Sequence, residues 1–145
     1  MEIFEVKEEN LEEVLKLSEA VFENESWNER QFTDALKNSR SIFFAAREHG
    51  DLLAFMLAED LVDSVNLLLI ATDKNFRNKN IASNLMLELE KITKNKKINK
   101  IWLDVKENNF SAINFYKKNN FENIYLRRNY YQNGISALIF EKILF

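Results

Sequence analysis

Hydrophobic positions recur with two different periods along this chain, and each period predicts one kind of element. Alternation at every second residue predicts strands, whereas apolar residues three and four positions apart predict helices. The predicted strands are Glu2–Val6, Ser41–Arg47, Leu52–Glu59, Val65–Thr72, Lys100–Val105, Phe121–Arg128 and Ile135–Ile143. The predicted helices cover about Glu9–Phe22, Asn28–Lys37, Ile81–Ile92 and Asn109–Lys118.

The order of these elements, β-α-α-β-β-β-α-β-α-β-β, predicts an α+β (α/β) fold. Val65–Thr72 is almost continuously apolar, which is typical of a strand buried on both faces in the middle of a sheet. The unit from Val65 to Val105 should cross over right-handed and pair its two strands in parallel. Hairpins before and after it make the sheet mixed and mostly antiparallel, with about seven strands and about four helices. No linker or repeat interrupts residues 1–145, so we expect one domain.

The composition narrows the class of protein. Hydrophobic residues make up 46% and charged residues 30% of the 145 positions, as in an ordinary globular domain. No apolar run approaches the roughly 20 residues that cross a bilayer, and the first residues lack a signal-peptide pattern. We therefore expect a cytoplasmic protein without membrane contact. The absence of cysteine excludes disulfides, thiolate metal sites and cysteine nucleophiles, and a single histidine leaves no His-rich metal cluster, so no metal is expected.

The charge distribution favours some partners over others. A net charge of −3 argues against charge-driven nucleic-acid binding and leaves room for a basic polypeptide substrate. The basic run Lys94–Lys100 is typical of a solvated helix end, with an RNA contact as the alternative. His49 falls in a predicted hairpin turn, which favours a surface role over a catalytic one.

The segment that joins the fourth predicted strand to the third helix carries candidate chemistry. A helix N-terminus presents free N–H groups and partial positive charge, which suit a phosphate, and Arg77 and Lys79 add full charges. The chain has no proline and only two glycines, so turns must rely on asparagine, and we predict a left-handed Asn80. Small Ala82 would allow close approach. A pyrophosphate site and an ordinary polar helix entry with Asn capping both fit these residues.

Four stretches of the chain carry a recognisable pattern: Glu25–Phe32, Arg77–Ala82, Ile101–Phe121 and Arg127–Tyr131. In this order they resemble the GCN5-related N-acetyltransferase (GNAT) superfamily and, within it, the bacterial ribosomal-protein-alanine N-acetyltransferases of the RimI type. Glu25–Phe32 resembles "PWSxxxF", with Ser26 in the proline place. Arg77–Ala82 resembles the coenzyme A loop Arg/Gln-x-x-Gly-x-Gly/Ala, with Asn80 in the glycine place. Ile101–Phe121 resembles "LWLEVRxSNxxAIxLYxxxGF", and Arg127–Tyr131 resembles "RRxYY".

The resemblance implies the GNAT fold, in which the central parallel pair splays apart, and acetyl-coenzyme A as cosubstrate. The pantetheine arm would pair with the exposed strand edge as an added strand. The phosphates would lie over the loop and the helix start, and a family asparagine would contact the arm. The residues at these positions are Ile70, Ala71, Thr72, Arg77, Asn78, Lys79, Asn80, Ile81, Ala82, Ser83 and Asn109.

The resemblance also implies catalytic roles. Asp104 takes the place of the family's general base, a Glu, and is one methylene shorter, which favours a bridging water. The alternative is that Asp104 merely ends a strand. Tyr116 matches the general acid that protonates the departing thiolate, and a core aromatic is its alternative. Without cysteine, direct attack by the amine in a ternary complex is expected, with pre-positioning supplying much of the rate.

The expected acceptor is the N-terminal α-amine of a peptide or protein, by analogy a ribosomal protein. Tyr130 and Tyr131 would bracket its first residues, while Trp27 and Phe32 either line the same groove or form the core face of a helix. One alternative is a GNAT activity on a lysine side chain or a small-molecule amine, against which Arg127–Tyr131 argues. Another is a non-catalytic module that binds acyl-coenzyme A or a protein partner.

Overall fold

The computed structural model describes residues 1–77 and 79–145, which contain seven strands and four α-helices. The strands are β1 (Glu2–Glu5), β2 (Ser41–Glu48), β3 (Asp51–Asp60), β4 (Val65–Thr72), β5 (Lys100–Lys106), β6 (Glu122–Arg127) and β7 (Ala137–Ile143). The helices are α1 (Leu11–Phe22), α2 (Glu29–Lys37), α3 (Ile81–Asn95) and α4 (Phe110–Lys118), with 3-10 turns η1 (Glu8–Asn10), η2 (Glu23–Glu25) and η3 (Lys74–Phe76). The predicted fold class and element order are confirmed.

Local chemistry explains where the helices begin. Asn28 and Gln31 form a capping box, because each side chain accepts a hydrogen bond from the other residue's backbone N–H at 2.9 Å. The Asn109 side chain accepts from the Ala112 backbone N–H at 3.2 Å and so begins α4. Asn80 precedes α3 with φ 61° and ψ 19°, which confirms the predicted left-handed conformation.

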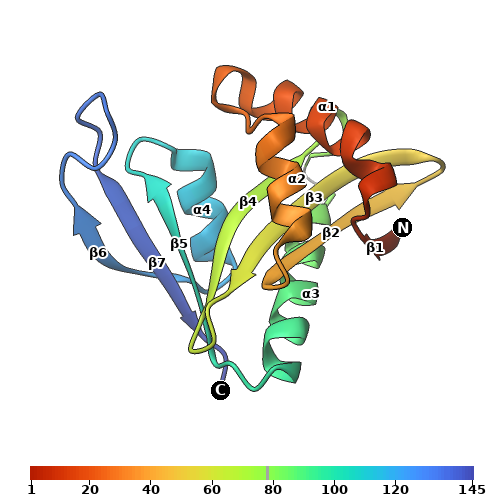
Figure 1. Ribbon diagram of the computed structural model, residues 1–145. Helices are drawn as coiled ribbons and strands as arrows, with labels where there is room; N and C mark the ends of the chain where they lie inside the picture. Colours follow the sequence, from red (N-terminus) through yellow and green to blue (C-terminus); the bar gives the residue numbers. More distant parts are fainter. Residues whose placement is uncertain (78) are drawn as a thin grey trace.

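One seven-stranded sheet has the order β1-β2-β3-β4-β5-β7-β6. Among the described strands, only β4 and β5 pair in parallel, and their register covers just two positions, Val65 opposite Ile101 and Asn66 opposite Trp102. Beyond these positions the two strands diverge into a V (Figure 1). The register of β4 against β3 also shifts between Leu57 and Ala58, so that Leu68 has no partner in β3.

Two layers of helix cover the sheet. Residues of α3 and α4, such as Leu85 and Ile113, share one core cluster with Ile101, Leu103 and Val105 of β5. Residues of α1 and α2 share a second cluster with β2 and β3 on the other face, which we call the α1–α2 face (Figure 1). Side chains alternate along a strand, so Trp102, Asp104 and Lys106 of β5 lie on the α1–α2 face.

The prediction that β4 is buried on both faces is wrong in its second half. Val65 and Leu67 are buried, but Leu68 is 40% exposed, and Leu69 and Ile70 are only partly buried. The reason is the divergence of β5, which leaves the far half of β4 without a neighbour on one side. An apolar run therefore marks a central strand here, but also one side of a cavity.

Candidate active site

A cavity of about 600 Å³ opens between the end of β4 and α4. Its walls come from the end of α1, the end of β4, η3, the start of α3 and one side of α4. The lining residues are Val21, Phe22, Ile70, Ala71, Thr72, Phe76, Arg77, Asn80, Ile81, Ala82, Ser83, Asn109, Ser111, Ala112, Asn114, Phe115, Tyr116 and Lys118. The structure thus brings together nine of the eleven residues predicted to bind the cosubstrate. Lys79 is exposed outside this lining, and Asn78 lies outside the described residues.

The start of α3 forms the end of the cavity that suits an anion. A helix leaves its first N–H groups without intrahelical partners, and here these belong to the turn that begins with Ile81. The left-handed Asn80 directs the chain from the loop into this turn. Arg77 lines the cavity, and the Lys79 ammonium lies 5.5 Å from the centroid of the Phe76 ring. Phosphate oxygens therefore fit this end by both hydrogen bonding and charge.

The edge of β4 forms one side of the cavity. Ile70, Ala71 and Thr72 pair with β3 on one side, and their positions lie beyond the two at which β4 pairs with β5. Their backbone groups on the β5 side are therefore available to an extended ligand, which can add to the sheet edge as a strand.

Tyr116 lies on the α4 side of the cavity and is also part of the core. Its ring packs 5.4 Å from Phe115, 5.7 Å from Phe121 and 6.2 Å from Phe140, measured between ring centroids. The residue is only 7% exposed and lines the cavity. Burial raises the pKa of its phenol well above the ordinary value, so Tyr116 is held protonated and can serve as a proton donor.

Asp104 lies on the opposite face of the sheet and outside the cavity lining. Its Oδ1 atom is buried and has no hydrogen-bond partner among the described residues. Burial raises the pKa of Asp104 above its usual value, and the positive charge of Arg127 offsets part of this rise. A buried carboxylate oxygen without a partner is costly, and it is available to a ligand proton or a water molecule.

Two tyrosines lie next to this carboxylate. Tyr130 and Tyr131 pack edge to face with their ring centroids 5.1 Å apart. Arg127 Cζ lies 5.4 Å from the centre of the Tyr130 ring, and Lys106 Nζ lies 5.4 Å from the centre of the Tyr131 ring. Burial, and then the negative charge of Asp104, raise the pKa of Tyr131. The two predicted acceptor tyrosines and the predicted base therefore share one surface.

Phe32 is a core residue, which is the second of the two alternatives that the sequence left open for it. It is 0% exposed and packs edge to face with Phe55, with ring centroids 5.8 Å apart. The capping box at Asn28 begins α2 so that Phe32 faces inward, which no acceptor can reach. Trp27 is half-buried and covers Phe32 at a centroid distance of 5.5 Å, so it alone of the two can reach the surface.

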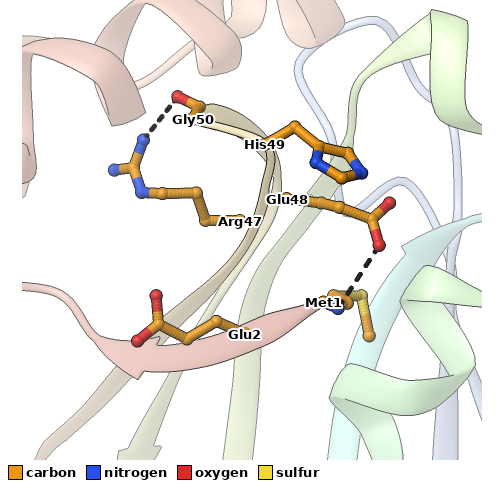
Figure 2. A pocket seen from close by; sticks show the side chains of 6 residues that line it. All are labelled: Met1, Glu2, Arg47, Glu48, His49 and Gly50. Atoms are coloured by element: carbon orange, nitrogen blue, oxygen red, sulfur yellow. Dashed lines mark hydrogen bonds and ion pairs between the residues drawn. The ribbon is translucent and has the colours of Figure 1, made fainter.

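A second hollow, of about 420 Å³, lies at the β2–β3 hairpin beside β1 (Figure 2). Two of its cations have partners within the hollow. Arg47 Nη1 donates to the Gly50 carbonyl at 3.0 Å, and the Met1 amine lies 3.3 Å from Glu48. Arg47 also binds Glu13 through both η nitrogens. His49 is exposed on this turn, as predicted. Within residues 1–77 and 79–145, no cluster of three or more acidic or histidine side chains suits a metal ion.

Comparison with known proteins agrees with this geometry. The family described as acetyltransferase (GNAT) matches residues 8–121. The chain belongs to the GNAT acetyltransferase family. A curated relative, the [ribosomal protein bS18]-alanine N-acetyltransferase of Escherichia coli strain K12, is 27% identical over 105 residues, which are 72% of this chain and 70% of the relative.

Solved structures show the same GNAT fold. The ribosomal-protein-S18-alanine N-acetyltransferase from Escherichia coli superposes with a TM-score of 0.89 at 23% identity, covering 99% of this chain and 93% of that one. The PaiA N-acetyltransferase from Thermoplasma acidophilum, solved in complex with coenzyme A, gives 0.83 at 22% identity, with 98% of each chain covered. The protein is therefore an acetyl-coenzyme A-dependent N-acetyltransferase, related to the RimI-type enzymes.

Sequence reasoning missed the outer side of α4 in this acetyltransferase. Ser111, Asn114 and Lys118 line the cavity from α4, and Lys118 adds a cation some forty positions after the loop that carries Arg77. The signal was present, because these residues are three and four positions apart and so form one stripe beside the core stripe of Ile113 and Tyr116.

Along the described part of the chain, no helix is long and apolar enough to cross a membrane.

Proposed function

We propose that this enzyme acetylates the N-terminal α-amine of a protein, with a basic ribosomal protein in the cytoplasm as the expected acceptor. The observation that carries the proposal is the buried Oδ1 of Asp104, which has no hydrogen-bond partner within residues 1–77 and 79–145. It lies near Tyr131, against which Tyr130 packs. The relatives named for alanine at the N-terminus of ribosomal protein bS18 support the same acceptor class. The domain that performs the reaction comprises residues 1–145.

Acetyl-coenzyme A would occupy the cavity between β4 and α4. The free N–H groups at the start of α3, with Arg77, Lys79 and Lys118, would hold its phosphates. The edge of β4 at Ile70–Thr72 would accept the pantetheine amides, and Asn109 would contact the arm from the other side. The residues present fit coenzyme A in charge and in shape. The acetyl end would lie near the point where β4 and β5 diverge.

Asp104 would act as the general base. The α-ammonium of a peptide has a pKa of about 7.7–8.0, so it loses its proton easily at neutral pH. Because burial makes Asp104 more basic than an exposed aspartate, its carboxylate is better suited to take that proton. Asp is one methylene shorter than the family's Glu, so we expect a water to carry the proton to Oδ1.

Tyr116 would act as the general acid. The amine nitrogen forms a bond to the thioester carbonyl carbon, the carbon–sulfur bond breaks, and Tyr116 gives its proton to the sulfur. The amide nitrogen sheds its second proton, which restores Tyr116 through water, and Asp104 returns its proton to solvent. One peptide ammonium and one acetyl thioester thus give one amide, one thiol and one proton released to solvent. The raised pKa of Tyr116 keeps the phenol protonated until the sulfur leaves.

The test is acetyl-coenzyme A-dependent labelling of a peptide pool with free N-termini and of the same pool with blocked N-termini. Label on free N-termini only, strongly reduced in Asp104→Asn and Tyr116→Phe, is expected. Asp51→Asn, at the exposed β2–β3 turn, is the matched control and should keep full activity. Label on lysine in the blocked pool would instead assign the enzyme to side-chain acetylation. Binding of acetyl-coenzyme A without any label would leave a binding module.

A further inference from the structure

The two arms of the V are joined by side chains at both ends on the α1–α2 face. At the closed end, Trp102 Nε1 donates to Ser64 Oγ at 3.1 Å, and Asn66 Nδ2 donates to the Trp102 carbonyl at 3.1 Å. At the open end, the Lys106 ammonium forms an ion pair with Glu25 of η2. These two residues are 81 positions apart. Lys106 belongs to β5, and Glu25 follows α1, which packs against β3 and β4 on the other side of the V.

Glu25 is held in place by its own segment. The neighbouring Ser26 Oγ lies 2.8 Å from Oγ of Ser18, a fully buried residue of α1, and donates to the Trp27 carbonyl at 2.9 Å. The Ser26 backbone N–H donates to the Glu23 carbonyl at 3.1 Å. The turn that contains Glu25 is therefore fixed on α1. The ion pair of Glu25 with Lys106 in turn holds β5 at a set distance from α1.

Lys106 connects this pair to the acceptor tyrosines. Its ammonium lies over the Tyr131 ring as well as beside Glu25, and its side chain is only 29% exposed. Tyr131 in turn packs against Tyr130, whose ring is covered by Arg127. The result is one continuous row from Glu25 through Lys106 and the two tyrosines to Arg127, and it passes beside the carboxylate of Asp104.

We propose that Glu25 and Lys106 are positioning residues for the acceptor: their ion pair holds the turn after α1 beside β5 and fixes the orientation of Tyr131. This inference rests on the proposed function, because it assigns the surface around Tyr130 and Tyr131 to a peptide N-terminus. Neither residue lines the coenzyme A cavity. Loss of the pair should therefore weaken acceptor binding, while the chemical step and acetyl-coenzyme A binding remain.

Steady-state kinetics of a double-mutant cycle test the proposal. For Glu25→Gln and for Lys106→Met, we expect the acceptor KM to rise about three- to tenfold, with kcat and the acetyl-coenzyme A KM within about twofold. The double variant should be no worse than either single variant, and the exchanged pair Glu25→Lys with Lys106→Glu should recover part of the loss. Glu5→Gln and Lys7→Met, which break an exposed pair on and beside β1, should change nothing.

Additive effects in the cycle, or a fall in kcat with acceptor KM unchanged, would overturn the positioning role. If the parent enzyme acetylates no peptide N-terminus, the proposed function fails, and hydrogen exchange then tests the pair by itself. Faster exchange of residues 129–134 in Glu25→Gln and Lys106→Met, but not in Lys7→Met, is expected. Unchanged exchange there would contradict the inference independently of the acceptor.

Discussion

Asp104 and Tyr116 lie on opposite faces of the sheet, both beside β5. Tyr116 shares a core cluster with Leu103 and Val105, the neighbours of Asp104 on β5, while Asp104 itself points to the α1–α2 face. The proposed base and the proposed acid, on opposite faces, can serve two ligands at once, one on each side of the sheet. This arrangement supports direct transfer between an amine on one side and a thioester on the other.

The pH dependence of kcat should report the charge balance at Asp104. Arg127 lowers the pKa that burial raises, so Arg127→Gln should raise the pKa of Asp104 further. The proposed base must be ionised to act, and the acidic limb of the kcat profile should therefore move to higher pH.

Asp104→Asn should lower kcat by about 10²- to 10⁴-fold, and Asp104→Glu should retain most activity.

The control for this pH profile is Arg128→Gln, which removes an adjacent exposed cation. Its acidic limb should coincide with that of the parent enzyme. An identical profile for Arg127→Gln and the parent would mean that Arg127 does not act on the carboxylate during turnover.

Asn80 should tolerate glycine but not a residue with a branched side chain. Its φ of 61° is open to glycine at no steric cost, whereas the left-handed conformation costs other residues about 1–2 kcal/mol. Asn80→Gly should bind coenzyme A at least as tightly as the parent, and Asn80→Val should bind more weakly and unfold at lower temperature. Calorimetric titration and thermal melts measure both effects, with exposed Asn84→Ala as the control.

Lys118 should contribute to cosubstrate binding and not to chemistry. It lines the cavity at the end of α4, so Lys118→Met should raise the acetyl-coenzyme A KM about three- to tenfold, with kcat unchanged. The difference should shrink as salt concentration rises, because a partly exposed charge is screened. The adjacent Lys117→Met, which is exposed and outside the cavity lining, is the matched control. Equal effects of both variants would indicate only a general loss of positive charge.

Phe32 should affect stability and not acceptor binding. Phe32→Leu removes ring contacts with Phe43 and Phe55 in a fully buried site, which should lower the free energy of unfolding by about 1–2 kcal/mol. The acceptor KM of the folded fraction should stay at the parent value. Trp27→Leu should cost less stability because Trp27 is half-buried, and a higher acceptor KM is expected there. Denaturant titration and peptide kinetics separate the two outcomes.

Local pattern was sufficient to predict the elements and one unusual backbone conformation. The hydrophobic periods, together with the continuous apolar run Val65–Thr72, predicted the seven described strands and the four described α-helices to within a few positions. The absence of proline, with asparagine left to form turns, predicted a left-handed Asn80. These features depend on residues close together in sequence. The same locality explains why Val65–Thr72 was recognised as a central strand but its exposed Leu68 was not, since exposure there depends on the divergence of β5.

Contacts across long sequence separations could not be predicted in this way. The pair Glu25 and Lys106, and the burial of Asp104 Oδ1, exist only after α1–α2 and β5–β7 have packed on the same face. Phe32 fitted equally well on a groove or in a core until its neighbours Phe43 and Phe55 were placed. The resemblance to a family named the reacting positions, but their electrostatic surroundings come from tertiary structure.

The insertion of β7 between β5 and β6 determines when this enzyme can become active during its synthesis. β6 pairs only with β7 in the sheet, and the long edge of β5 that faces away from β4 is completed by β7 as well. β7 therefore fixes the position of Tyr130 and Tyr131 relative to Asp104 on β5. This cannot happen until β7 has left the ribosome. β1–β4, α1 and α2 all precede β7 in the chain, so the proposed acceptor site is completed last.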